Sequence, residues 1–215
     1  VYENTDYEFY VLKLNQGGGS DSPAFSDNVR VNYEGFTLQD EVFDNSVTPV
    51  VFDLISLIPG WRKALPDFNT SESFIDNSDG TVNFINNGLG VMFLPSGLAY
   101  FSSSTPGITA YSPIIFKFEL LQAFQNDHDN DGVPSYLEDL NGDGEFIVNF
   151  QDLTDTTDDD TDGDGTPNFA DPDDDNDGIL TINEDINNDG DPTNDDSNGN
   201  GIPNYLDVTD KIKKS

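Results

Sequence analysis

The sequence predicts an α+β protein made of two parts, a β-rich segment with one short helix followed by an irregular array of acidic repeats. Residues 1–125 contain several strand-like patterns and a single good helix candidate. Residues 126–215 repeat the phrase Asp-x-Asp-x-Asp-Gly with near variants. A chain of 215 residues is expected to form one or two domains. The boundary is expected near Gln125 and Asn126, because the apolar content falls and the density of Asp and Asn rises there.

Five segments of the first part have the composition of β-strands, with β-branched and aromatic residues at near-alternate positions. They are residues 7–14, 29–38, 50–54, 91–94 and 113–121. The last is the clearest, because Ile114, Phe116 and Phe118 alternate with the side chains of the other face. A segment of about 120 residues with these strands can bury one modest core.

Residues 58–65 are the only good helix candidate, and Pro59 stands near the start, where its missing N–H costs nothing. Residues 69–87 are polar and are expected to form a long loop or an excursion from the fold. Within that loop, Asp79 and Gly80 suit a hairpin turn.

The negative charge is concentrated in the second part of the chain. From Asn126 onward there are 27 acidic and 3 basic residues, a net charge of −24; the first part has 15 acidic and 5 basic residues, a net of −10, and the two sum to −34. Like charges at this density oppose compaction, so the second part is expected to be disordered unless cations neutralise it. No nucleic acid partner is expected, because phosphate binding needs a basic face. The lysines of residues 211–214 are expected to be a solvated end.

The chain has no cysteine, which excludes a disulfide framework, catalytic thiols and zinc–thiolate sites. No stretch of 18 apolar residues occurs, so no transmembrane segment is expected. The sequence starts at Val1 rather than Met, and this is compatible with a signal segment or a lipid anchor upstream.

The acidic phrase matches the pattern of an EF-hand calcium loop. In that pattern, positions 1, 3 and 5 supply side-chain oxygens, glycine at position 6 permits a tight turn, position 7 offers its carbonyl, and an acid at position 12 closes the shell. Five of the six copies have a carboxylate at position 12, and the exception has Phe150 there. The six copies begin at Asp127, Asp139, Asp160, Asp173, Asp185 and Asp196.

Hard cations prefer oxygen ligands, so this spacing predicts several structural Ca²⁺ ions as the cofactors of the second part. The expected ligands are Asp127, Asp129, Asp131, Val133, Glu138, Asp139, Asn141, Asp143, Asp160, Asp162, Asp164, Thr166, Asp171, Asp173, Asp175, Asp177, Ile179, Glu184, Asp185, Asn187, Asp189, Asp191, Asp196, Asn198, Asn200, Ile202 and Asp207. The sole histidine, His128, stands at position 2 of the first copy, where side chains usually face solvent, and no catalytic role is expected for it.

The copies differ from EF-hands because the short spacing between them leaves no room for flanking helices. Four also carry proline at position 8, which cannot donate the backbone bond that pairs two EF-hand loops. The segments DHDNDGVPSYLED and DPDDDNDGILTINED resemble thrombospondin type 3 repeats, in which consecutive loops wrap a string of calcium ions. That resemblance implies a calcium-stabilised spacer, although the cysteines of the family's animal members are missing.

Two alternatives to a spacer are a disordered acidic tail and a calcium sensor. The recurring glycine at position 6 argues against a disordered tail, because a disordered tail does not need glycine there. A sensor exposes a Met-rich groove, and the chain has one methionine, Met92, outside the repeats. Weak calcium arrays saturate only where calcium is near millimolar, so the expected location is extracytoplasmic: the periplasm, the outer-membrane surface or the exterior.

Four motifs of the first part occur in an order that resembles the FKBP-type peptidyl-prolyl isomerase domain. They are VRVNYEGFTLQDEVFDNS (29–46), LIPGWRKAL (57–65), FLPSGLAY (93–100) and PIIFKFELL (113–121). The resemblance covers about residues 7–124. It implies a twisted antiparallel sheet around one short helix, a hydrophobic pocket between them, rotation of X–Pro bonds, and proline-containing polypeptide segments as partners.

The same resemblance implies a site of nine residues. They are Tyr33, Phe43, Asp44, Val50, Leu57, Ile58, Trp61, Tyr100 and Phe116. In the family, the residue matching Asp44 is a buried acid, the backbone N–H matching Ile58 binds substrate, and the residue matching Trp61 forms the floor. The hydroxyl matching Tyr100 meets a substrate carbonyl.

The chain departs from the family at the rim of this site. Val50 stands where an aromatic residue is expected, Phe101 stands where glycine is usual, and the loop of residues 101–112 lacks the family's histidine. Between Trp61 and Tyr100 there are about sixteen more residues than in a minimal member. Two rivals to the isomerase therefore remain, namely a non-catalytic binding module and a structural surface protein whose calcium array is the main functional part.

Overall fold

The computed structural model describes residues 6–155 and 157–214, and it divides into two compact units, Val1–Gln125 and Asn126–Ser215. This division falls at the residue where the composition changes. No helix in the described residues is both long enough and apolar enough to span a membrane.

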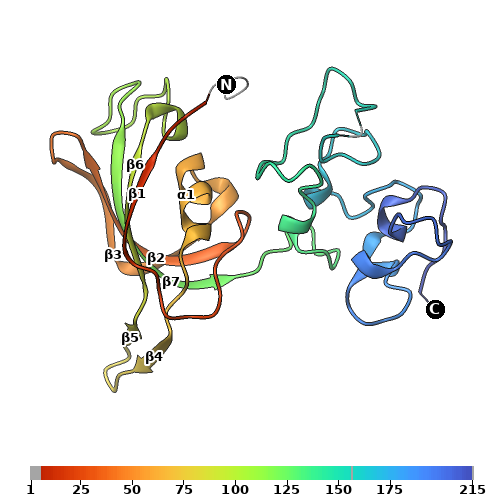
Figure 1. Ribbon diagram of the computed structural model, residues 1–215, viewed down its shortest axis with the longest axis horizontal. Helices are drawn as coiled ribbons and strands as arrows, with labels where there is room; N and C mark the ends of the chain where they lie inside the picture. Colours follow the sequence, from red (N-terminus) through yellow and green to blue (C-terminus); the bar gives the residue numbers. More distant parts are fainter. Residues whose placement is uncertain (1–5, 156, 215) are drawn as a thin grey trace. The chain divides into compact units, whose positions relative to one another are not determined.

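The first unit is built on a five-stranded sheet in which all neighbouring strands are antiparallel (Figure 1). The strand order is β1-β6-β7-β2-β3. The strands are β1 Tyr10–Asn15, β2 Asn28–Thr37, β3 Val42–Asp53, β6 Gly88–Leu94 and β7 Ile114–Phe124. The predicted antiparallel sheet with one short helix is confirmed.

Alternation of side chains in the sequence predicts the faces of β7 correctly. Ile114, Phe116 and Phe118 are buried, whereas Lys117 between them is exposed. The prediction for β3 is too short, because the strand begins at Val42 rather than near residue 50. Residues 44–49 of this strand are mostly polar and end in Pro49, a composition that an edge strand tolerates because one side needs no ladder hydrogen bonds.

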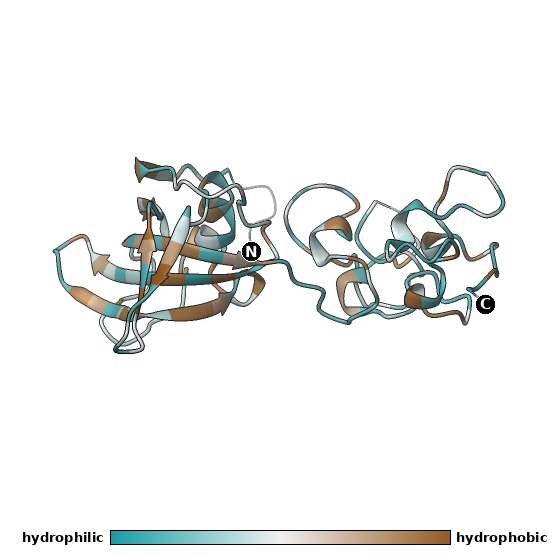
Figure 2. Ribbon diagram, turned by 90° about the horizontal axis from the view of Figure 1, so that it is seen from below, coloured by the Kyte–Doolittle hydropathy of each residue, from teal (hydrophilic) through white to brown (hydrophobic). Residues whose placement is uncertain are grey.

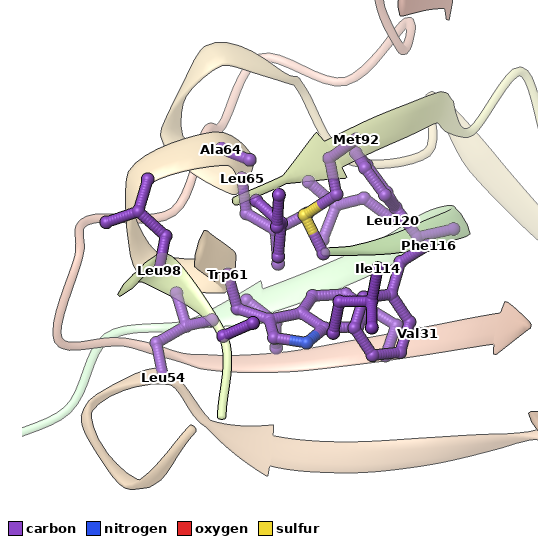
Figure 3. Packing of buried hydrophobic residues seen from close by; sticks show 14 of the residues in the cluster. Val31, Leu54, Trp61, Ala64, Leu65, Met92, Leu98, Ile114, Phe116 and Leu120 are labelled. Atoms are coloured by element: carbon purple, nitrogen blue, oxygen red, sulfur yellow. The ribbon is translucent and has the colours of Figure 1, made fainter. Parts of the chain in front are cut away.

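The only α-helix of the described residues is α1, Pro59–Ala64, which packs against the inner face of the sheet. Pro59 occupies the first turn, as the sequence predicts. Gly60 is buried, and a Cβ there would overlap Leu94 Cδ1, so the helix lies very close to β6. Figure 3 shows Trp61 and Ala64 of α1 among the buried side chains of the sheet. Three 3₁₀ turns complete this layer, η1 Leu54–Ser56, η2 Leu65–Asp67 and η3 Ser96–Leu98.

Residues 69–87 form an excursion, as one of the two expectations has it, but not a plain loop, because the segment contains a β-hairpin. Strands β4, Ser73–Asp76, and β5, Val82–Ile85, pair antiparallel and project from the end of the unit in Figure 1. Phe74 and Phe84 face each other across the pair, with ring centroids 6.3 Å apart. The turn at Asp79 and Gly80 is as predicted, and Gly80 has a φ of 85° that favours glycine.

The second unit consists of loops joined by 3₁₀ turns, without an α-helix or strand in its described residues. The turns are η4 Ser135–Leu137, η5 Asn168–Ala170, η6 Thr181–Asn183, η7 Pro192–Asn194 and η8 Asn204–Leu206. Figure 2 shows hydrophilic loops, with hydrophobic colour mainly at the short turns. The glycine at position 6 has a positive φ in all six copies, as its role in the turn requires.

Candidate functional site

An aromatic cluster surrounds Trp61, which is 3% exposed at the centre of the first unit (Figure 3). Its ring lies 5.0 Å from Phe116 and 5.9 Å from Tyr33, and the contact with Tyr33 is edge-on at 88°. Phe43 joins the cluster through Phe116, at 5.4 Å. The four aromatic residues that the resemblance implies for the floor, walls and last strand are thus brought together. Such ring contacts are worth about 0.5–1.5 kcal/mol each beyond burial.

Phe52 is part of this cluster, and sequence reasoning missed it. Its ring lies 5.6 Å from Tyr33 and 6.4 Å from Trp61. It stands two residues after Val50 on β3, so both side chains are on the same face of the strand. Both pack against the core, and Phe52 supplies aromatic surface close to where Val50 departs from the family. The period-2 rule for strands could have identified it.

Two phenols and a carboxylate meet beside the aromatic cluster. The hydroxyl of Tyr33 donates to Asp44 Oδ2 at 2.8 Å. Burial, followed by the hydrogen bond and charge of Asp44, raises the pKa of Tyr33 to about 12. Burial and the same carboxylate also raise the pKa of Tyr100, so Asp44 is electrostatically close to both phenols.

The burial implied for Asp44 is wrong, because its side chain is exposed. Asp44 lies on β3, the edge strand, opposite Gly35 of β2. Glycine offers no side chain that could cover the carboxylate. A Cβ at Gly35 would lie 2.5 Å from Phe43 Cζ and 2.7 Å from Phe116 Cε1, so the aromatic contacts require glycine there.

The start of α1 carries the two aliphatic residues of the predicted site. Leu57 and Ile58 are half-buried against the core. The carbonyl of Ile58 accepts a hydrogen bond from Trp61 N at 3.1 Å, which fixes the peptide next to the aromatic cluster. In the described part of the chain, the N–H of Ile58 has no acceptor, so it can serve an incoming carbonyl.

Two aromatic residues of the loop after Tyr100 adopt backbone angles that glycine would adopt at a lower cost in free energy. Phe101 has a φ of 48° and Tyr111 a φ of 59°, both in the left-handed region, which costs about 1–2 kcal/mol for each such residue. Their rings contact edge-on at 5.3 Å, and Tyr111 N donates to Phe101 O at 2.6 Å. Ile108 of the same loop is buried in the core, and Gly107 lies against Phe43. The altered loop is therefore packed onto the cluster wall.

A hollow of about 250 Å³ lies where β2, β3 and β7 adjoin, and its lining shares Tyr33 with the aromatic cluster. Its lining includes Asn32, Glu34, Lys117 and Glu119, which alternate along the strands with the core-facing side chains. Asn32 Nδ2 already donates to Glu119 Oε2 at 2.8 Å. These polar groups suit solvent better than a proline ring, so the aromatic cluster is the better candidate site.

The second unit brings its acidic side chains together in five groups, each with ligand atoms within 4.8 Å of one another. Three groups contain only predicted ligands from one copy. The other two include an acid that was not predicted, Asp159 or Asp174. The groups are Asp127, Asp129 and Asp131; Asp131, Glu138 and Asp174; Asp139, Asp143 and Asp159; Asp160, Asp162 and Asp164; and Asp173, Asp175 and Asp177.

The copies that begin at Asp185 and Asp196 form no group of three acids among the described residues. Asparagine replaces aspartate at position 3 of the former and at positions 3 and 5 of the latter. Their loops nevertheless close in the same way, because Asp185 Oδ2 accepts from Gly190 N at 3.1 Å and Asp196 Oδ2 accepts from Gly201 N at 2.8 Å. The ligand roles predicted for these copies remain predictions.

Several carboxylates of the array are buried without a hydrogen-bonding partner. Glu138 and Glu184 are fully buried, and neither oxygen of either group has a partner among the described residues. Burial, reinforced by neighbouring carboxylates, raises the pKa of Glu138 to about 10 and that of Glu184 to about 8. A buried anion without compensation is strongly unfavourable. This arrangement therefore suits either a bound cation or a protonated acid.

A polar contact between positions 2 and 9 closes four of the copies, and sequence reasoning missed it. His128 contradicts the expectation of a solvent-facing side chain, because its Nδ1 lies 2.8 Å from Ser135 Oγ and its Nε2 lies 2.8 Å from Asn126 Nδ2. The recurrence of polar residues seven positions apart is the signal that could have identified these contacts. The four pairs are His128–Ser135, Thr161–Asn168, Asp174–Thr181 and Ser197–Asn204.

The end that carries the final lysines is largely exposed, as predicted, and the Lys211 side chain is 60% exposed, but two of the lysines also contact the acidic loops. Lys211 Nζ donates to Asp177 O at 2.8 Å, and Lys214 N donates to Asn183 O at 2.8 Å. Lys214 Nζ also lies 3.9 Å from Asp185 Oδ2. The high negative charge of the loops attracts the few cations that this unit contains.

Comparison with known proteins identifies the first unit. The model of the family described as FKBP-type peptidyl-prolyl cis-trans isomerase matches residues 19–121. FkpA of Escherichia coli K12, named as an FKBP-type peptidyl-prolyl cis-trans isomerase, is 32% identical over 114 residues, which are 52% of this chain and 36% of FkpA. The peptidyl-prolyl cis-trans isomerase Mip of Coxiella burnetii is 31% identical over 113 residues, 51% of this chain and 42% of Mip.

A solved peptidyl-prolyl cis-trans isomerase from Pseudomonas syringae overlaps 54% of this chain and 76% of its own, at 26% identity and a TM-score of 0.45, and we draw no conclusion from an overlap of this size. The sheet, the helix and the family match together define a domain of the isomerase class. The chain contains an FKBP-type peptidyl-prolyl cis-trans isomerase domain, and it spans well under half of the length of the two curated relatives described above.

A different family model, described as BamM C-terminal, matches residues 128–187 of the second unit. The match begins at position 2 of the first acidic copy and ends at position 3 of the copy that starts at Asp185. Calcium binding and the likeness to thrombospondin type 3 repeats remain predictions.

Proposed function

We propose that the first unit catalyses the rotation of X–Pro peptide bonds in polypeptides outside the cytoplasm. The observation that carries this proposal is the cluster of Tyr33, Phe43, Trp61 and Phe116 beside the unused N–H of Ile58. The family match over residues 19–121 supports the same reaction.

The chemistry needs neither a nucleophile nor a metal. Rotation about an X–Pro bond is slow because amide resonance must be broken, at a barrier of about 20 kcal/mol. Aromatic surface that receives the proline ring excludes water and favours the less polar, twisted amide. The N–H of Ile58 donates to one substrate carbonyl, and this contact counts toward catalysis only where it is stronger for the twisted state.

Tyr100 is the phenol that we assign to the substrate. The hydroxyl of Tyr33 already donates a hydrogen bond to Asp44. The backbone carbonyl of Tyr100 accepts from Ser103 N at 2.9 Å, but its hydroxyl makes no hydrogen bond to the described residues. Its ring packs against the core close to the same carboxylate. Its hydroxyl is therefore free to donate to a carbonyl next to the rotating bond.

The test is a cis–trans exchange assay with a proline-containing peptide, using the full chain in calcium. We expect catalysis by the unaltered protein, a lower kcat/KM for Tyr100→Phe, and an unchanged value for the control Tyr10→Phe, whose side chain is 69% exposed. Absence of catalysis by the folded protein would exclude the isomerase.

A binding module without turnover is the second candidate. Val50 and Phe101 favour it, because the first removes an aromatic side chain from the rim and the second fixes a loop that glycine would leave mobile. This candidate predicts that a proline peptide binds and that Trp61→Leu weakens binding, while the exchange rate stays at background.

We also propose that the second unit is a spacer that folds around calcium ions, and that it works where calcium is near millimolar, in the periplasm, at the outer-membrane surface or outside the cell. The buried, unpartnered carboxylates of Glu138 and Glu184 support this proposal. About five or six Ca²⁺ would cancel 10–12 of its 24 net negative charges, at one ion per copy. Limited proteolysis with calcium and with chelator tests it, and equal resistance in both conditions would contradict it.

A further inference from the structure

The group formed by Asp131, Glu138 and Asp174 joins two copies that are far apart in the sequence. Asp131 and Glu138 belong to the copy that begins at Asp127, and Asp174 belongs to the copy that begins at Asp173. One oxygen from each of the three lies within 4.8 Å of the others. A twelve-residue loop pattern contains no such contact, because it describes ligands from one copy only.

All three side chains are buried, and their facing oxygens have no hydrogen-bonding partner. Asp131 and Asp174 are 1% exposed and Glu138 is 0% exposed. The oxygens without a partner in the described residues are Asp131 Oδ2, Asp174 Oδ1 and both oxygens of Glu138. The group therefore contains four buried carboxylate oxygens that neither solvent nor a hydrogen-bond donor satisfies.

The remaining oxygens of the two aspartates are occupied, and this fixes the orientation of both side chains. Asp131 Oδ1 accepts from Val133 N at 2.7 Å, and Asp174 Oδ2 accepts from Thr181 Oγ1 at 2.9 Å. Asp131 Oδ2 and Asp174 Oδ1 are thus the oxygens left available to a ligand. No lysine or arginine of the described residues forms an ion pair with any of the three.

Asp174 is at position 2 of its copy, and the loop pattern does not require an acid at that position. Position 2 is His128, Leu140, Thr161, Ile186 or Ser197 in the other copies. In the Asp173 copy, the loop's own group is formed by Asp173, Asp175 and Asp177, without Asp174. The carboxylate at position 2 is therefore available to the other copy.

We propose that Asp131, Glu138 and Asp174 bind a second divalent cation, Ca²⁺, next to the one held by Asp127, Asp129 and Asp131, so that Asp131 bridges two ions. An all-oxygen, carboxylate-rich set is typical of Ca²⁺ sites. Two Ca²⁺ carry four positive charges against the five negative charges of these side chains. The inference rests on the proposed calcium spacer. It adds a cross-link, because this ion joins the first copy to Asp174, which lies 43 residues beyond Asp131 in the sequence.

The ion count of the full chain tests this site. The variant Asp174→Asn is expected to bind one Ca²⁺ fewer than the unaltered protein in equilibrium dialysis with metal analysis. The control Asp152→Asn makes the same charge change at an exposed residue outside all five groups, and it should bind as many ions as the unaltered protein.

The outcomes separate this inference from the proposal on which it rests. If the unaltered protein binds no Ca²⁺, the calcium spacer itself is wrong. If the unaltered protein binds Ca²⁺ and Asp174→Asn binds the same number with the same affinities, only the cross-loop site is wrong.

A crystal of the unaltered protein grown with Ca²⁺ decides the matter if Asp174→Asn does not fold. Two anomalous peaks that share Asp131 would support the site. A single peak at the group of Asp127, with none between Glu138 and Asp174, would overturn it.

Discussion

Replacing Glu138 with glutamine is expected to have opposite effects with and without calcium. Glu138 is the position-12 acid of the first copy, fully buried and without a hydrogen-bonding partner for either oxygen in the described residues. With calcium, Glu138→Gln removes a charged ligand and weakens binding. Without calcium, the same change removes a charge that the folded array cannot accommodate, and the array becomes more stable at neutral pH.

The size of the effect without calcium follows from the pKa of this carboxyl. Burial and the charges of Asp174 and Asp131 raise the pKa of Glu138 from 4.5 to about 10. A group whose pKa is raised in the folded state stabilises it fully below the unfolded value, and the contribution is lost as the pH rises toward the folded value. At pH 7 the folded state must take up a proton that the unfolded state lacks, which costs about 3 kcal/mol at 1.36 kcal/mol per pH unit. Glutamine avoids this cost.

Size-exclusion chromatography of the full chain in chelator, from pH 5 to pH 9, measures this difference. We expect the array to expand as the pH rises, and Glu138→Gln to expand at a higher pH than the unaltered protein. The exposed variant Asp152→Asn is the control. Identical elution of Glu138→Gln and the unaltered protein across this range, or expansion of the variant at a lower pH, would refute the reasoning.

Three further changes test the first unit. Asp44→Asn should lower the pKa of Tyr33 from about 12 toward 10, because it removes the negative charge at 2.8 Å; spectrophotometric titration measures this, and an unchanged pKa would contradict the contact. Gly60→Ala should lower the free energy of unfolding by about 1–3 kcal/mol in urea, because its Cβ would overlap Leu94. The double variant Phe74→Ser and Phe84→Ser should speed hydrogen exchange in the β4–β5 hairpin while leaving that of β7 unchanged, and equal acceleration in both would show that the hairpin is part of the core.

Local rules predicted those features of this chain that local physics determines. The faces of β7 follow from alternation, because a strand places successive side chains on opposite sides whatever its neighbours are. The positive φ of glycine at position 6 follows from the tight turn that positions 1 to 5 make. The hairpin turn at Asp79 and Gly80 was predicted, but its strands β4 and β5 were missed because they have four residues each and polar residues surround them.

Features that depend on distant parts of the chain could not be predicted in this way. Asp44 is exposed because β3 is the last strand of the sheet, which is a property of strand order and not of sequence spacing. Asp159 and Asp174 reach groups centred on other copies, whereas the calcium pattern describes twelve consecutive residues. Phe52 is the intermediate case, since its face follows from the strand period once β3 is known to extend through it.

The 3₁₀ turns of the second unit have a spectroscopic consequence. Each turn spans three residues, and the described segments between them contain neither helix nor strand. The amide dichroism of the whole chain will therefore come almost entirely from the sheet and helix of the isomerase domain. Unfolding of the entire acidic unit would change that spectrum little, so an unaltered far-ultraviolet signal would be no sign that the unit had stayed folded.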